Sequence, residues 1–126
     1  MAMELIRRAT IHDDSKLESP EKETFDKWSP ELKKAEWGTD YYKVSLEGMG
    51  EGLRHHYAVN SHHPEHYAAG VDGMDLFDVV EMFCDWRAAA EAKGVAIDLE
   101  HAAKRFNLSP QLVKIFRNTL QRDWTM

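Results

Sequence analysis

The sequence predicts an all-α fold, a compact bundle of helices that ends in a helical hairpin. Three observations lead to this prediction: serine-proline pairs typical of helix starts, one long segment with a helical apolar period, and the absence of alternating strand patterns. The predicted helices cover residues 3–12, 20–28, 30–37, 50–61, 75–93, 98–107 and 110–122. The segment 41–46 is short enough to be a strand or a turn of helix, and we interpret it as helix.

Serine precedes proline at three of the predicted helix starts, in the pairs Ser19-Pro20, Ser29-Pro30 and Ser109-Pro110. A serine side chain at the cap accepts a hydrogen bond from the first turn, and proline fits the first helical position because no N–H is needed there. The second pair therefore predicts a break between the helices 20–28 and 30–37.

The segment 75–93 has the clearest helical period. Apolar residues recur there at the spacing of one helix face, namely Leu76, Val79, Val80, Phe83 and Trp86. This stripe is expected to face the core. Gly94 follows as the residue that ends the helix.

A glycine cluster, Gly48, Gly50 and Gly52, precedes the predicted helix 50–61. A phosphate-binding glycine loop needs a strand before it and a helix after it. No convincing strand precedes this cluster, so we interpret it as a flexible hinge.

Length and composition describe one globular domain, residues 1–126, with a metal-site bundle in 1–95 and the C-terminal hairpin in 96–126 packed on it. The net charge of −6 argues against a protein built mainly to coat nucleic acid. The single cysteine, Cys84, excludes an internal disulfide and a cysteine-based zinc finger. No segment reads as a membrane span or a signal peptide, so we expect a cytoplasmic protein with no membrane partner.

Histidines are the most informative feature. Six of the seven lie in the first 66 residues: His12, His55, His56, His62, His63 and His66. On a helix over 50–61, His56 shares the face of Leu53 and Tyr57, whereas His55 lies on the neighbouring strip. Pro64 disfavours helical geometry at the residue before it, so the later histidines are expected at a helix junction. A solvated, histidine-rich surface is the alternative interpretation, but imidazole is the commonest metal ligand.

Two further sequence elements place a carboxylate on or beside the apolar face of a predicted helix. His12-Asp13 ends the helix 3–12 on its inward face, where such a pair is costly to bury unless it is paired or binds a metal. Asp85 lies beside the apolar stripe of helix 75–93. The alternatives are a solvated helix end for the first element, and for Asp85 an ion pair with an arginine such as Arg87 or Arg54.

The order of these elements resembles the HD-domain metal-dependent phosphohydrolases. His12-Asp13 with Lys16 resembles their His-Asp and lysine element, and His62-His63-Pro64-Glu65 resembles the His-His-Glu element of members with two metal ions. Asp85 resembles their late aspartate. The string from His55 to His63 looks most like an uncharacterised family found in phages and bacteria. The likeness covers about residues 9–90.

The resemblance implies a helical bundle around one or two divalent ions and the hydrolysis of a nucleotide or another small phosphate ester. The metal ligands it implies are His12, Asp13, His55, His56, His62, His63 and Asp85. This mixed nitrogen and oxygen set suits Mn, Fe, Co, Ni or Zn better than calcium. Lys16 is the implied catalytic residue, which offsets charge on the phosphate.

One departure from the HD pattern bears on the ligand set. HD enzymes carry a further metal-binding histidine upstream of the His-Asp pair, and no histidine precedes His12. Either His55 or His56 supplies that ligand, a partner subunit of a homodimer does, or the site lacks it. The sequence does not decide which member of each histidine pair is the ligand.

The segment from Leu99 to Arg117 reads as helix, short turn and helix, and resembles a helix-turn-helix DNA reader. Few basic residues, only Lys114 and Arg117, would face a groove early in the second helix. We therefore favour a hairpin that caps the bundle. The alternative function is a non-enzymatic metal-binding or structural phage or bacterial regulator whose tail binds a partner or DNA.

Overall fold

A computed structural model describes residues 1–124 and confirms the all-α prediction. Seven α-helices account for the fold in these residues, which contain no strand. They are α1 (Ala2–Ile11), α2 (Glu21–Lys34), α3 (Asp40–Gly48), α4 (Gly50–Val59), α5 (Leu76–Lys93), α6 (Leu99–Phe106) and α7 (Pro110–Leu120). Three short 3-10 helices, η1 (Asp14–Leu17), η2 (Pro64–His66) and η3 (Gly70–Gly73), join them. The segment 41–46 is helical as predicted.

The predicted break at Ser29-Pro30 is wrong, because α2 runs without interruption from Glu21 to Lys34 with Pro30 inside it. A proline within a helix removes the hydrogen bond to the carbonyl four residues earlier, here that of Asp26. Both Pro30 and Asp26 are exposed. Water can therefore bond the freed carbonyl, and packing of the opposite face keeps the helix continuous.

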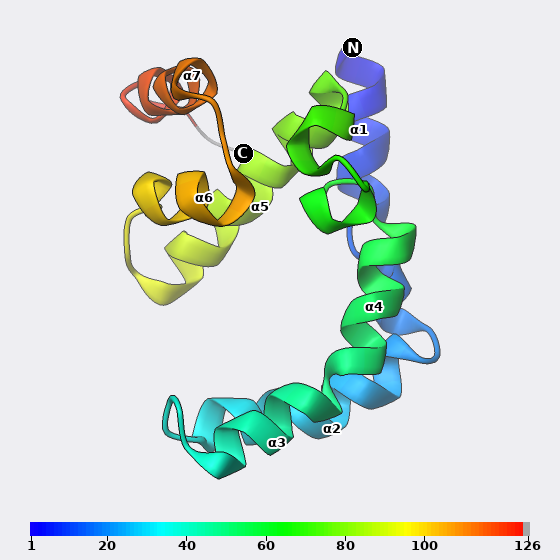
Figure 1. Cartoon of the computed structure of the whole chain (residues 1–126). Helices are drawn as coiled ribbons and strands as arrows, with labels where there is room; N and C mark the ends of the chain where they lie inside the picture. The colour runs from blue at the N-terminus through cyan, green and yellow to red at the C-terminus, as the bar shows by residue number, and fades with distance from the viewer. Residues whose placement is uncertain (125–126) are drawn as a thin grey trace.

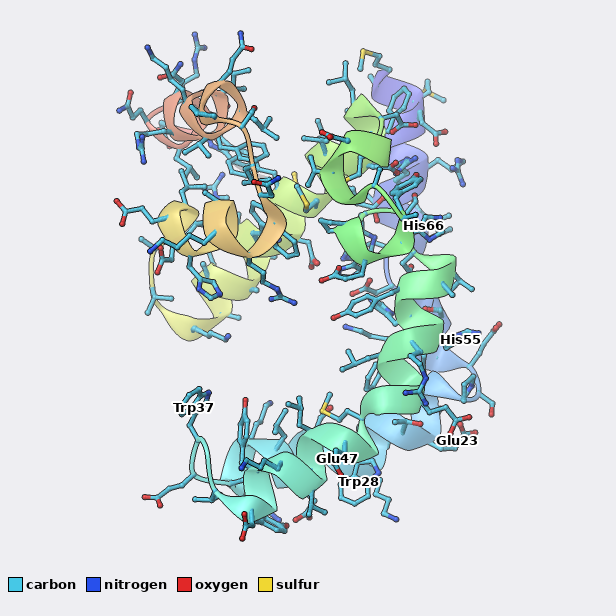
Figure 2. The ribbon with its side chains drawn as sticks, in the orientation of Figure 1. Glu23, Trp28, Trp37, Glu47, His55 and His66 are labelled. Carbon is cyan, nitrogen blue, oxygen red and sulfur yellow. The ribbon has the colours of Figure 1, made fainter. Side chains whose placement is uncertain are left out.

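The glycines that were interpreted as a hinge instead permit close helix packing. A Cβ at Gly48 would lie within 2.2 Å of the ring of Trp28, and one at Gly52 would lie 2.9 Å from the side chain of Thr24. Figure 2 shows Trp28 where α2 meets α3. Only a residue without a side chain allows α3 and α4 to approach α2 this closely.

The helices follow an open arc (Figure 1). α2 and α3 lie side by side at one end, α6 and α7 lie at the other, and α1, α4 and α5 lie between them. No helix in residues 1–124 combines the length and the apolar character needed to cross a bilayer.

Apolar burial is concentrated at one end of this arc. The buried apolar side chains among the described residues are Met82, Phe83, Leu99, Ala102, Leu108 and Phe116, all from α5, α6, α7 or the turn between the last two. The rings of Phe83 and Phe116 stack with their centroids 4.5 Å apart. Asn107 makes the turn with a left-handed backbone, and Ser109 caps α7 through the Leu112 N–H. The C-terminal hairpin is thus packed on α5.

Polar side chains are buried where the other helices meet. Glu21, Ser45, His56, His62 and Asp78 each expose 4% of their surface or less. A buried polar or charged group is costly unless it is hydrogen-bonded, paired or bound to a metal. The N-terminal half of the molecule is therefore held together by interactions that must satisfy these groups.

Candidate metal centre

The centre begins at the end of α1, where the chain reverses direction. His12 follows the last residue of α1, and Asp13 has a left-handed backbone with φ 57° before η1 begins. Aspartate is one of the few residues that tolerate this conformation. The tight reversal places His12 and Asp13 next to each other against α4, α5 and the loop after α4.

The first ligand group contains Asp13, His56, His62 and His63, whose donor atoms all lie within 4.8 Å of one another. The Oδ1 atom of Asp13 is 3.4 Å from Nε2 of His56 and 3.3 Å from Nε2 of His62. Nε2 of His56 is 2.9 Å from Nε2 of His63. One carboxylate and three imidazoles are therefore close enough to hold a metal ion.

A second group, His12, His62 and Asp85, shares His62 with the first. Nε2 of His12 lies 3.3 Å from Oδ1 of Asp85, and Nε2 of His62 lies 3.7 Å from Oδ2 of the same carboxylate. Nε2 of His12 is also 3.4 Å from Oδ2 of Asp13. Asp13 belongs to the first group and its other oxygen lies near His12 of the second, so the two groups are adjacent.

Two glutamates contact the Nδ1 atoms of three of these histidines. Oε2 of Glu81 lies 2.8 Å from Nδ1 of His12 and 2.8 Å from Nδ1 of His62. Oε1 of Glu21, which has no exposed surface, lies 2.6 Å from Nδ1 of His56. An ionised carboxylate only accepts hydrogen bonds, so each of these three rings, when neutral, carries its proton on Nδ1 and directs the Nε2 lone pair into the centre. This arrangement is typical of metal-binding histidines.

Further polar side chains fix Glu21 in place. The Ser15 hydroxyl donates to Oε1 of Glu21 at 2.9 Å, and the Asn60 amide donates to the Ser15 oxygen at 2.8 Å. His55 contacts Oε2 of Glu21 through Nδ1 at 2.5 Å. Side chains from η1 and α4 thereby lock the orientation of the buried carboxylate.

Carboxylates close to the histidine rings raise the proton affinity of the centre when no ion is bound. Hydrogen bonds to Asp85 and Glu81 raise the pKa of His12 to about 10. Burial opposes the charging of His62, but its contacts with Asp13 and Glu81 raise its pKa to about 9. Burial and the neighbouring His62 and His56 lower the pKa of His63 to about 4. Extra protons, or a cation that replaces them, are needed to balance the carboxylates.

Two buried atoms of the centre face each other without an accepted hydrogen bond. Oδ1 of Asp13 and Nε2 of His62 are both buried, and neither makes a hydrogen bond to any of the described residues. They lie 3.3 Å apart. With the His62 proton held on Nδ1 by Glu81, only a second proton on the ring or a positive ion can satisfy both atoms.

A separate buried network adjoins the centre through Arg8. Oδ1 of Asp78 accepts from Arg8 at 2.9 Å and from the Ser61 hydroxyl at 2.6 Å, and Oδ2 accepts from the Tyr67 hydroxyl at 2.6 Å. Burial opposes the ionisation of Asp78, but these hydrogen bonds lower its pKa below the usual value. Arg8 also reaches Glu81 at 3.2 Å, which links the network to the ligand support.

Six of the seven ligands implied by the sequence offer an atom to the two groups. The seventh, His55, is outside both groups and contacts Glu21 instead. Figure 2 labels it on α4. His66 contacts the carbonyl oxygen of Tyr57 at 2.8 Å instead of the centre. Lys16 lies 3.1 Å from Asp13, with about half of its side chain exposed. Asp85 faces histidines and not the arginines considered from the sequence.

Sequence reasoning missed Glu21, Glu81 and Asp78. A usable signal existed on α5, because Asp78, Glu81 and Asp85 recur at i, i+3 and i+7 and so form an acidic stripe on one face. No such signal marked Glu21. An acid in the first turn of a helix is ordinarily explained by the helix dipole.

A cavity of about 340 Å³ adjoins the first ligand group. It is lined by Asp13, Lys16, Phe25, Ser29, Met49, Leu53, His56, Tyr57, His63 and Asp85. Ligand residues and Lys16 thus share one space with side chains from α2 and α4. The size is at the lower end of the range for small-molecule sites.

These features define a helical protein with a histidine and aspartate cluster that is able to hold a metal ion beside a small cavity. A family model described as a family of unknown function, DUF5662, matches residues 1–122, and the chain belongs to this family. No curated protein and no solved structure matches the chain significantly. The chemistry of the protein therefore has to be argued from its site.

Proposed function

We propose that the protein is a divalent-metal-dependent phosphohydrolase that acts on a small phosphate ester. The observation that carries the proposal is the pair of buried, unpartnered atoms, Oδ1 of Asp13 and Nε2 of His62, which face each other within the ligand groups. A positive ion at this place satisfies both atoms.

The donor set favours a transition metal. His12, His56, His62 and His63 supply imidazole nitrogen, and Asp13 and Asp85 supply oxygen. Such a mixture suits Mn, Fe, Co, Ni or Zn. Both groups contain the same Nε2 atom of His62, which binds one ion only, so the centre holds either one ion or two ions of which a single one is bound by His62. When bound, such an ion supplies Lewis acidity to a phosphoryl oxygen and makes water more acidic.

The residues of the chain bind and orient the ester. Lys16 lines the same cavity as the ligands, so its ammonium group offsets the negative charge of a phosphate there. Asp13 holds that ammonium 3.1 Å from its own Oδ2. Glu21 and Glu81 fix the histidine rings, which keeps the centre ordered before substrate arrives.

The test combines metal analysis with an activity assay. The purified protein is expected to carry stoichiometric metal, to lose it to a chelator, and to hydrolyse phosphate esters only after metal is restored. His12→Ala should abolish hydrolysis, whereas His101→Ala, which alters an exposed histidine outside both groups, should not. Protein that retains no metal, and whose hydrolysis is unchanged by His12→Ala, would refute the proposal.

A metal that only stabilises the fold is the competing explanation, because polar residues fill the interior around the centre. Stoichiometric metal without hydrolysis of any ester would favour it.

A further inference from the structure

The cavity beside the first ligand group has two unlike sets of lining residues. One set contains the ligands Asp13, His56, His63 and Asp85 together with Lys16. The other set is a wall from α2, α4 and the residue between α3 and α4: Phe25, Met49, Leu53 and Tyr57, with Ser29 as the polar exception.

The apolar wall begins immediately at the ligands. The ring of Phe25 meets that of His56 edge-on with the centroids 6.2 Å apart, and the ring of Tyr57 lies 5.1 Å from that of His63. Leu53 precedes His56 by three positions and Tyr57 by four, so the three share one face of α4. A ligand held by the centre therefore contacts apolar side chains next to its charged group.

The wall offers few hydrogen bonds. Beyond the ligands and Lys16, the lining contains two hydroxyl groups, those of Ser29 and Tyr57, and no amide, carboxylate or guanidinium group. A nucleobase has several donors and acceptors on its edge, and each one that is buried without a partner weakens binding. An alkyl or aryl group has none and gains from burial.

We propose that the ester group of the substrate is apolar, so that the protein acts on alkyl or aryl phosphate monoesters and not on nucleotides. This inference rests on the proposed function. Lys16 and the metal centre bind the phosphate end, and Leu53 and Phe25 select the ester group by contact. Leu53 is thus a specificity-determining residue.

The binding test uses phosphonates, which resist hydrolysis. Methyl-, butyl- and hexylphosphonate and the phosphonate analogue of a nucleoside monophosphate are titrated calorimetrically into the metal-loaded full chain. The dissociation constant is expected to fall by about fourfold per methylene while the wall is being covered. The nucleoside analogue is expected to bind no more tightly than methylphosphonate.

Variants test the role of the wall. Leu53→Ala should flatten the dependence on chain length, and Phe25→Leu serves as a second variant of the same wall. Leu46→Ala is the matched control, because Leu46 is an exposed leucine on α3 outside the cavity. Circular dichroism confirms that each variant is folded before titration.

The outcomes separate this inference from the proposed function. Hydrolysis of phosphate esters without a chain-length dependence, or tightest binding of the nucleoside analogue, overturns the substrate class alone. A chain-length dependence without hydrolysis of any corresponding ester overturns the phosphohydrolase function. If none of the phosphonates binds, the inference is also refuted.

Discussion

Removal of bound metal should destabilise the N-terminal half of the protein by an amount that can be calculated. Four carboxylates, those of Asp13, Glu21, Glu81 and Asp85, surround the histidines of the centre. An ion that binds only the folded state at 100 times its dissociation constant stabilises that state by about 2.7 kcal/mol. For a domain of this size, that free energy corresponds to an increase in melting temperature of about 10 °C.

The assay is thermal unfolding of chelated protein, titrated separately with Mn, Co, Ni and Zn and followed by circular dichroism. His62→Gln should remove most of the shift, because His62 belongs to both ligand groups. His101→Gln is the control, and metal should raise its melting temperature as much as it raises that of the unaltered chain. An identical melting temperature with and without every one of these ions would refute the reasoning, because a satisfied centre must favour the folded state.

Three further predictions concern residues outside the two ligand groups. Asp78→Asn leaves the partly buried Arg8 with a weaker partner and should cost about 3 kcal/mol in urea unfolding. Because the folded-state pKa of Asp78 is lowered, the stabilisation from Asp78 is complete above about pH 4 and is lost as the pH falls below that, so the difference between the two proteins should vanish in acid. Gly52→Ala forces a methyl group against α2 and should destabilise by about 1–3 kcal/mol, and an unchanged urea midpoint would contradict the packing described. Glu81→Gln should weaken metal binding by roughly 10- to 100-fold, and more than Glu21→Gln does, because Glu81 orients two ligands and Glu21 orients one; equal effects in calorimetric titrations would count against this division.

Local pattern was sufficient for those parts of the site that depend on a single helix. The apolar neighbours of His56 placed it on the inward face of α4, and it is buried. The same reasoning put Asp85 beside the apolar stripe of α5, where it meets His12. In both cases helix periodicity predicted the direction of the side chain. The expectation that the whole stripe of α5 faces the core was wrong for Leu76 and Val80, which are exposed.

Helix periodicity could not predict which side chains of different helices come into contact. Glu21 and Asp26 lie in the same helix and look alike in sequence, yet Glu21 is buried under the histidines of α4 and Asp26 is exposed. What distinguishes them is the approach of α4 to α2, which depends on Gly52. The continuity of α2 through Pro30 has the same origin, because packing overrides a local helix-breaking signal.

The same residues that hold the ligands also replace an apolar core in the N-terminal half. Apolar burial lies in α5, α6 and α7, whereas α2 and α4 meet through buried Glu21 and His56. Because each of these groups is costly to bury alone, losing one partner leaves the others unsatisfied. We therefore expect folding of this half and assembly of the centre to be coupled, because α5 contributes to both the apolar core and the centre.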